Sequence, residues 1–317
     1  MKKALKVTGK ILLSIVILFA AALLICFVVN RILMKSEESL LEKPMGQLVE
    51  VDGHNMHVYT EGQGDHTLLF LSGSGTAAPA LDFKSLYSQL SGEYKIAVVE
   101  KYGYGFSDVV DCDRDFEVIL RQDREALEKA GVSGPYILCP HSMSGIEAIL
   151  WAQEHPEEVE GIVGLDMALP RHYDELDLKS SLRFEKLAAF GREAGVVRFG
   201  YLDSALPEKL TKDEKKLYRA IGCKKACNVD VMNEGVAIPD ACRLIDSRPK
   251  PDVPMLMFTS DGKETGCENW ITAQYDYAED LTSAKVIELN CGHYVHNFEY
   301  QRISGEIRTF TEGLQKN

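Results

Sequence analysis

A serine lies where a buried strand turns sharply into a helix, an arrangement that can expose a nucleophile. The apolar run Tyr136–Cys139 predicts the strand, Ser142 follows it, and an amphipathic helical pattern begins directly afterwards. A nucleophile elbow of this kind usually reads G-x-S-x-G, and here Pro140 and Ser144 stand at the two glycine positions. If Ser144 were the nucleophile, branched Ile146 would take the second glycine position, so Ser142 is the better candidate. An ordinary N-cap serine is the alternative that this segment alone leaves open.

Three further segments follow predicted strands and could serve such a serine. The first is the glycine-rich Leu71–Gly75, and the second is Glu100–Asp108. The third, Asn290–His296, follows the last predicted strand and contains His293. A histidine on a loop at this edge of the sheet can reach the serine and take its proton as a general base.

Together these segments resemble the α/β-hydrolase superfamily in their order and relative places, over about Val51–Leu314. The loop with His293 is similar to the superfamily's G-H histidine loop, and Glu100–Asp108 is similar to its D-x-x-G-x-G-x-S-D turn. By this resemblance Ser142 is the nucleophile and His293 the base. His296 is a weaker candidate for the base because no glycine precedes it.

The resemblance also implies an oxyanion hole. Leu71–Gly75 occupies the place of the H-G-x-x-G oxyanion loop, with Ser72 where histidine is usual. The backbone N–H groups of Ser74 and Met143 would stabilise the negative oxygen that develops during the reaction. His141, which is next to the nucleophile, is expected to shape the pocket.

The third catalytic group, an acid that orients His293, has several candidates. In the superfamily it usually lies a few residues beyond the strand that corresponds to Met255–Phe258, and Asp261 and Glu264 are near that position. In a second variant the acid follows the preceding strand, and Asp166 ends that strand here. Asp166 could equally be a structural carboxylate that caps a turn. Asp261 and Asp166 both remain candidates, with Glu264 as a third.

The resemblance implies a serine hydrolase that acts through an acyl-enzyme. His293 would take the Ser142 proton, and Ser142 would attack the carbonyl of an ester, thioester or amide. Water would then release the acyl group. The expected substrate is a small acyl compound or a short peptide, and nothing in the sequence implies a metal or an organic cofactor.

Three other functions remain open. The altered elbow glycines and the ambiguous acid leave room for a non-catalytic binding or sensor protein on the same fold. An acyltransferase would keep the serine and pass the acyl group to an acceptor other than water. A dinucleotide-binding oxidoreductase is the third alternative, since Gly73-x-Gly75-x-x-Ala78 follows a strand and Glu100 is near the place of a ribose-binding acid. That hypothesis leaves the elbow and the histidine loop unexplained.

Alternating strand and helix patterns predict an α/β-hydrolase fold, a mostly parallel twisted sheet with helices on both faces. Two alternating runs around Asp52-Gly53 predict an antiparallel hairpin at the start of the sheet.

A charged, strand-poor stretch predicts a helical cap over the C-terminal edge of the sheet. The predicted domains are a core of residues 47–170 and 251–317 and a cap of residues 171–250, after a linker of residues 36–46. The predicted strands after the hairpin are Thr67–Leu71, Ile96–Val99, Tyr136–Cys139, Gly161–Leu165, Met255–Phe258 and Val286–Leu289, and the predicted helices are Phe116–Ala130, Met143–Gln153 and Ile303–Leu314.

An uncharged run, Ile11–Val29, predicts one transmembrane helix within an anchor of residues 1–35. At about 1.5 Å per residue it is long enough to cross the hydrocarbon core of a bilayer. A cleaved signal peptide is the alternative, but the run is long for a signal sequence and no A-x-A-like site follows it. Four lysines precede the run, against Arg31 and Lys35 after it. The positive-inside rule then places the N-terminus in the cytoplasm and the catalytic domain outside it.

Charge argues against nucleic acid as a partner. The first 35 residues hold six of the 35 Lys and Arg and no acid, so the remainder has 29 basic and 48 acidic residues. A body with that excess of negative charge repels a phosphate backbone.

Overall fold

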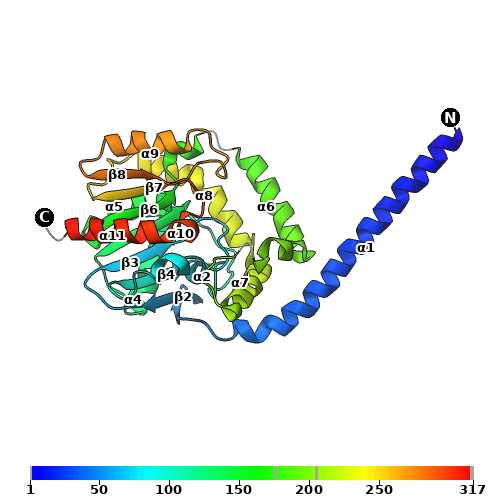
Figure 1. The fold of residues 1–317 in the computed structure, drawn as a ribbon, viewed down its shortest axis with the longest axis horizontal. Coiled ribbons are helices and arrows are strands. Elements are labelled where there is room, and N and C mark those ends of the chain that lie inside the picture. Colours follow the sequence, from blue (N-terminus) through cyan, green and yellow to red (C-terminus); the bar gives the residue numbers. More distant parts are fainter. Residues whose placement is uncertain (1, 175–176, 204–205, 315–317) are drawn as a thin grey trace.

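The computed structural model describes residues 2–174, 177–203 and 206–314. Its described part contains an eight-stranded sheet in the order β1-β2-β4-β3-β5-β6-β7-β8 (Figure 1). β1 and β2 form an antiparallel hairpin, β2 is antiparallel to β4, and the other neighbours are parallel. The strands are β1 (Gln47–Val51), β2 (His54–Glu61), β3 (Thr67–Leu71), β4 (Lys95–Glu100), β5 (Tyr136–Ser142), β6 (Val159–Met167), β7 (Met255–Thr259) and β8 (Ala284–Glu288).

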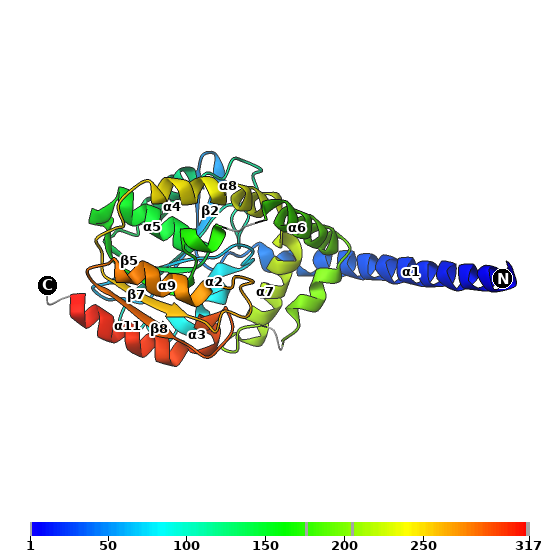
Figure 2. The same cartoon turned by 90° about the horizontal axis from the view of Figure 1, so that it is seen from above.

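Helices pack on both faces of the sheet, with α4 and α5 on one side and α3 and α11 on the other (Figure 2). Each face carries a buried apolar cluster, because strands covered on both sides contribute side chains to both. The helices are α1 (Lys2–Leu41), α2 (Pro79–Asp82), α3 (Lys84–Tyr87), α4 (Phe116–Lys129), α5 (Ser144–Glu154), α6 (Leu178–Glu193), α7 (Lys212–Lys225), α8 (Val229–Asp246), α9 (Trp270–Glu279), α10 (Val295–Phe298) and α11 (Tyr300–Leu314), with short 3-10 turns η1 (Pro156–Glu158), η2 (Pro170–Tyr173) and η3 (Val196–Tyr201).

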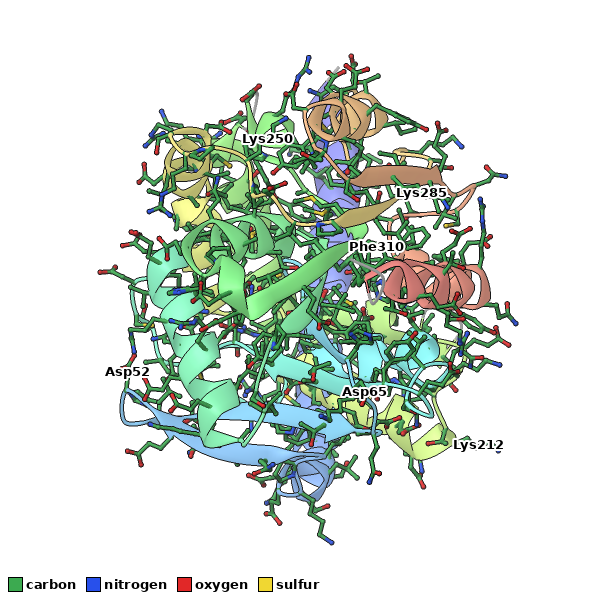
Figure 3. The ribbon with its side chains drawn as sticks, turned by 90° about the vertical axis from the view of Figure 1, so that its left-hand side faces the viewer. Asp52, Asp65, Lys212, Lys250, Lys285 and Phe310 are labelled. Carbon is green, nitrogen blue, oxygen red and sulfur yellow. The ribbon has the colours of Figure 1, made fainter. Side chains whose placement is uncertain are left out.

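The predicted architecture, a mostly parallel sheet with helices on both faces, is confirmed. Each strand predicted after the hairpin overlaps a strand of the sheet, and the predicted helices overlap α4, α5 and α11. One strand is longer than its apolar run, because β5 continues through Pro140 to Ser142. Polar surface residues such as Lys212 and Lys285 project outward around this core (Figure 3).

The stretch predicted as a cap lies between β6 and β7 and contributes α6, η3, α7 and α8. Among its described residues it adds no strand to the sheet. Residues 175–176 and 204–205 of the predicted cap lie outside the described residues, as do residue 1 of the predicted anchor and residues 315–317 of the predicted core.

The N-terminal helix α1 differs from the prediction at its end. It continues to Leu41, so the first half of the predicted linker 36–46 is helical. The cause is a tertiary contact: Glu37 forms a bidentate pair with Arg198 of η3, at 3.0 and 2.7 Å. From Lys6 to Leu41, α1 is long and apolar enough to cross a membrane, with a mean hydropathy of 3.2 in its most apolar window.

Candidate active site

Ser142 occupies a strained turn between β5 and α5. Its φ of +54° lies in the left-handed region, which residues other than glycine rarely adopt. The turn is also crowded: a Cβ added to Gly73 would lie 2.6 Å from the Ser142 Cβ, and one added to Gly145 would lie 2.2 Å from the Ala168 carbonyl oxygen. The chain therefore needs small residues at these points to bring Ser142 to the edge of the sheet.

Ser144, which replaces the second glycine of the usual elbow pattern, is fully buried and holds the turn. Its hydroxyl lies 2.7 Å from the Leu71 carbonyl oxygen at the end of β3 and 2.9 Å from the His141 carbonyl oxygen. It also accepts the His141 N–H at 3.0 Å. A residue with these internal partners is unavailable as a nucleophile, which agrees with the choice of Ser142.

Ser142, His293 and Asp166 form a continuous hydrogen-bonded chain. The Nε2 atom of His293 lies 2.9 Å from the Ser142 Oγ, and its Nδ1 atom lies 2.6 Å from the Asp166 Oδ2. These groups come from the ends of β5 and β6 and from the loop after β8. Because parallel strands end at the same edge of a sheet, segments more than a hundred residues apart meet here.

The Asp166 carboxylate is fully buried and all its contacts favour one orientation. Its Oδ1 atom accepts the backbone N–H of Ser260 and the indole Nε1–H of Trp270, each at 2.7 Å. Its Oδ2 atom is thereby left for His293. Trp270 was not foreseen from the sequence, since it lies at the start of α9, 104 residues from Asp166, and nothing in the local pattern marks it.

The other two acid candidates lie close to His293 but bond elsewhere. The Asp261 carboxylate accepts the backbone N–H of Lys263 at 3.1 Å and its ammonium at 2.6 Å. These hydrogen bonds to Lys263 lower the pKa of this partly exposed aspartate. Glu264 accepts the backbone N–H of His293 at 2.8 Å, so it contacts the main chain of the histidine.

The two residues predicted for the oxyanion hole flank the turn. Met143 is the N-cap residue of α5, and its N–H is one of the groups that a helix N-terminus leaves without an intrahelical partner. Ser74 is exposed on the loop after β3, next to Gly73, whose backbone touches Ser142. Both predicted N–H donors therefore belong to segments that meet at Ser142.

Two buried histidines near the site, His141 and His296, have their Nε2 atoms directed to partners other than Ser142. His141 is buried, and its Nε2 atom lies 3.2 Å from the His293 carbonyl oxygen. Burial, together with the neighbouring His293 and His296, holds the pKa of His141 well below its usual range. His296 is also buried, with its Nε2 atom 2.7 Å from the Asp82 Oδ2.

A cavity of about 670 Å³ opens over Ser142 and His293. One wall comes from the start of the cap, and the other comes from the loop before α9 and from Trp270, the first residue of that helix. The His172 ring stacks on the Trp270 indole at 4.1 Å, so these two side chains form a flat wall beside His293. Other lining residues are Arg171, Asp177, Glu264, Cys267, Glu268 and Asn269.

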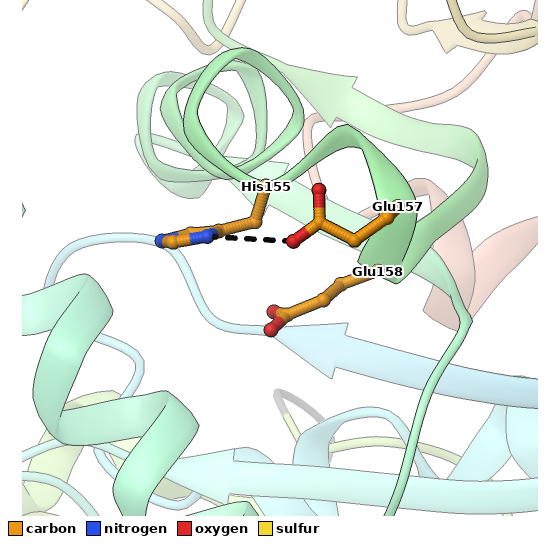
Figure 4. Close-up of side chains that lie close together, drawn as sticks. All are labelled: His155, Glu157 and Glu158. Atoms are coloured by element: carbon orange, nitrogen blue, oxygen red, sulfur yellow. Dashed lines mark ion pairs between the residues drawn. The ribbon is translucent and has the colours of Figure 1, made fainter.

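One group of side chains elsewhere has the spacing of a metal site, but its partners argue against that role. His155, Glu157 and Glu158 converge near η1 (Figure 4). The Glu158 carboxylate is already held by Arg124, and it accepts the Trp151 indole N–H at 2.8 Å. A cation there would have to displace a guanidinium, so these residues form a surface ion-pair group.

The structure also weakens the dinucleotide hypothesis. Glu100, which in the sequence is near the place of a ribose-binding acid, is fully buried and its carboxylate is hydrogen-bonded within the fold. It accepts the N–H groups of Ala80 and Phe106, and it lies 2.8 Å from the His57 Nδ1. No carboxylate oxygen of Glu100 is left to face a ligand.

Comparisons with known proteins identify a relative of the chain and the fold that it shares with solved structures. No protein-family model matches the chain. A Bacillus subtilis (strain 168) protein described as uncharacterized protein YbdG is 35% identical over 312 residues, which cover 95% of each chain.

Solved structures share the fold at low sequence identity. A loop variant of the haloalkane dehalogenase DbeA from Bradyrhizobium elkanii is 16% identical with a TM-score of 0.65, covering 85% of this chain and 97% of that one. A Pseudomonas aeruginosa protein assigned as an epoxide hydrolase is 14% identical with a TM-score of 0.66, covering 85% and 96%. The chain has the α/β-hydrolase fold and belongs to the same family as the Bacillus subtilis protein YbdG.

Proposed function

We propose that the protein is a serine hydrolase, with Ser142 as nucleophile, His293 as general base and Asp166 as the acid that orients His293. The observation that carries this proposal is the unbroken chain of contacts from the Ser142 Oγ through both nitrogens of His293 to the Asp166 Oδ2. A histidine held between a hydroxyl and a carboxylate can accept the hydroxyl proton, and the carboxylate stabilises the imidazolium that forms.

In the proposed reaction, the Ser142 oxygen attacks the carbonyl of an ester, thioester or amide as His293 Nε2 takes its proton. The backbone N–H groups of Ser74 and Met143 stabilise the oxyanion. His293 then protonates the leaving group, and water cleaves the acyl-enzyme. The cavity over Ser142 accommodates a small acyl compound or the end of a short peptide.

The proposal assigns a part to each region of the chain. Residues 47–170 and 251–317 form the catalytic core, and residues 171–250 form a cap that supplies one wall of the cavity. α1 anchors the protein as a single uncleaved transmembrane span, with its N-terminus in the cytoplasm and the catalytic domain outside it. The apolar length of α1 and the four lysines before its apolar run support this topology.

Covalent labelling by a fluorophosphonate tests the proposal directly, because such a probe reacts only with an activated serine. We expect labelling of the detergent-solubilised full chain, its loss in Ser142→Ala, and its retention in Ser144→Ala. Ester hydrolysis, measured as kcat/KM, should fall about 10⁴- to 10⁶-fold in Ser142→Ala.

Two outcomes would overturn it. Labelling that persists in Ser142→Ala would place the nucleophile elsewhere. No labelling of a wild-type protein that melts cooperatively would favour a binding or sensor protein on this fold.

A further inference from the structure

An uncovered apolar surface lies on the cap beside α1. The helix α6 has no fully buried residue, and Phe184 and Leu187 on it are 72% and 66% exposed. Phe190 at its end and Phe199 on η3 extend the same kind of surface. Large apolar side chains gathered in this way on a protein surface mark a site of contact with another apolar body. The α6–η3 surface comprises Phe184, Leu187, Phe190, Val196, Phe199 and Leu202.

The contact between the cap and α1 fixes the depth of this surface. A Cβ added to Gly195, which separates α6 from η3, would lie 2.7 Å from the Cys26 carbonyl oxygen and 2.5 Å from the Asn30 Cβ. Cys26 and Asn30 are at the end of the uncharged run Ile11–Val29. If that run spans the bilayer, Gly195 lies where the hydrocarbon core meets the lipid headgroups.

Polar contacts hold this arrangement together. Asn30 is buried at the junction, where its Oδ1 accepts Arg198 Nε–H at 2.6 Å. Arg31 pairs with Glu193 at 3.0 Å, and Arg198 pairs with Glu37. The cap is therefore attached to α1 through residues that precede and follow Gly195 in the chain, Glu193 and Arg198, and it cannot turn its apolar surface away without losing these contacts.

The direction of α6 suits an interfacial helix. It runs crosswise to α1, and the sheet lies on the side away from the N-terminal end of α1 (Figure 1). Exposed basic side chains at Lys179, Arg183 and Lys186 accompany the apolar ones along α6. Basic residues beside an apolar face are the pattern of helices that lie in the plane of an anionic membrane surface.

We propose that the α6–η3 surface contacts the lipid bilayer in which α1 is anchored, with its apolar side chains at the level of the headgroups and upper acyl chains. The surface begins about two turns beyond Asp177, which is the N-cap residue of α6 and lines the cavity over Ser142. Membrane contact would hold the rim of that cavity against the lipid surface. This proposal concerns placement and does not depend on catalysis by Ser142.

Tryptophan depth quenching tests the proposal on the full chain. The variants Leu187→Trp, on α6, and Leu48→Trp, on β1, make the same change at two exposed leucines. Leu41, at the end of α1, lies about 16 Å from Asn30 along the helix, on the side away from the bilayer. Leu48 follows it in the chain. Phe19→Trp, within the uncharged run, reports the span itself. Each variant is reconstituted in phosphatidylcholine–phosphatidylglycerol vesicles with and without brominated acyl chains, and the emission of the parent protein is subtracted. The bromines lie near the headgroup for Leu187→Trp and Leu48→Trp, and near the chain end for Phe19→Trp, because Phe19 is at the middle of the uncharged run.

We expect brominated lipid to quench the tryptophan introduced at Leu187 roughly twofold and to leave the one at Leu48 unchanged, as follows from a helix buried several ångströms into the interface. Equal behaviour at the two sites would overturn the proposal. Shielding of the Leu187 site from aqueous iodide without quenching by brominated lipid would also overturn it, because a protein surface would then cover α6. So would an absence of quenching in Phe19→Trp, since α1 would not be a span.

Discussion

At the scale of single residues, the surroundings of the carboxylates separate the acid candidates. Asp166 is buried with two N–H donors on Oδ1, so Oδ2 faces His293 before any substrate arrives. Asp261 is one strand away, but its carboxylate is directed to Lys263. A carboxylate that must stabilise an imidazolium is most effective when its orientation is fixed in advance.

The matched pair Asp166→Asn and Asp261→Asn tests this difference. Asparagine keeps the shape of Asp166 but removes its charge and can present an amide N–H to His293, which favours the wrong tautomer. We expect kcat/KM for a chromogenic ester to fall about 10³- to 10⁴-fold in Asp166→Asn. Asp261→Asn should stay within about twofold of wild type, because the Asp261 carboxylate is bonded to Lys263 and does not contact the His293 ring nitrogens. The reverse order of effects would assign the acid to Asp261.

Trp270 is expected to act through Asp166 as a positioning residue. Trp270→Phe keeps an aromatic ring against His172 and removes the indole N–H that reaches Asp166. A hydrogen bond to a charged group contributes about 1.5–3 kcal/mol, so we expect kcat to fall roughly 10- to 100-fold. KM for a small ester should change little, and the melting temperature by only a few degrees. A rise in KM at constant kcat would instead show that Trp270 only binds substrate.

The backbone of Ser142 stores strain that stability measurements can detect. At a φ of +54°, a residue with a Cβ is disfavoured, and glycine is not. We therefore expect Ser142→Gly to unfold in urea with a free energy about 1 kcal/mol higher than Ser142→Ala. Equal stability of the two inactive variants would mean that the turn relaxes when the hydroxyl is removed.

At the scale of elements, η2 and the start of α9 are joined by a histidine that must stay neutral. The His172 Nδ1 accepts the Leu169 N–H, and its Nε2 donates to the Trp270 carbonyl, both at 3.0 Å. Protonation of Nδ1 would break the first of these bonds. Burial lowers the pKa of His172 to about 4, from an ordinary value near 6.5.

This pKa predicts a loss of stability in acid. Below about pH 6.5 the unfolded chain binds a proton at His172 that the folded chain does not bind. The contribution of neutral His172 to the free energy of unfolding is therefore fully present above that pH and is lost as the pH falls toward 4. We expect the free energy of unfolding to fall about 1–2 kcal/mol more in wild type than in His172→Gln between pH 7 and pH 5. Urea titrations at the two pH values measure the difference. The same fall in both proteins would place the acid sensitivity elsewhere.

Local sequence patterns predicted the elements well, because strands and helices depend on runs of a few residues. β3 coincides with its apolar run Thr67–Leu71, and the elbow and the histidine loop were found from motifs beside such runs. The choice between Asp166 and Asp261 could not be made in this way, since both follow neighbouring strands. It depends on Trp270 and Ser260, whose contacts with Asp166 span about a hundred residues. The extension of α1 likewise depends on a distant partner, Arg198.

At the scale of the whole molecule, a buried ionic group joins the core to the cap. Lys101 follows β4, and its ammonium contacts Glu234 of α8 and lies 3.5 Å from Glu147 of α5. All three side chains are almost completely buried. Burial opposes the charge of Lys101, but Glu234 and Glu147 hold its pKa above the usual range. Asp123 lies beside them, and burial together with the neighbouring Glu147 raises its pKa well above the usual range.

Removal of this lysine should loosen the cap as well as destabilise the core. Lys101→Met leaves two buried carboxylates without their shared cation, and the loss of one partner of a buried ion pair costs about 3–5 kcal/mol. We expect the urea midpoint to fall accordingly, whereas the surface variant Lys212→Met should change the free energy of unfolding by less than about 0.5 kcal/mol. Adding Glu234→Gln to Lys101→Met removes one of the stranded charges, so the double variant should be more stable than Lys101→Met alone. If Glu234→Gln destabilised the Lys101→Met protein by as much as it destabilises wild type, Lys101 and Glu234 would be energetically uncoupled. The attachment of α8 would then have to come from its apolar contacts alone.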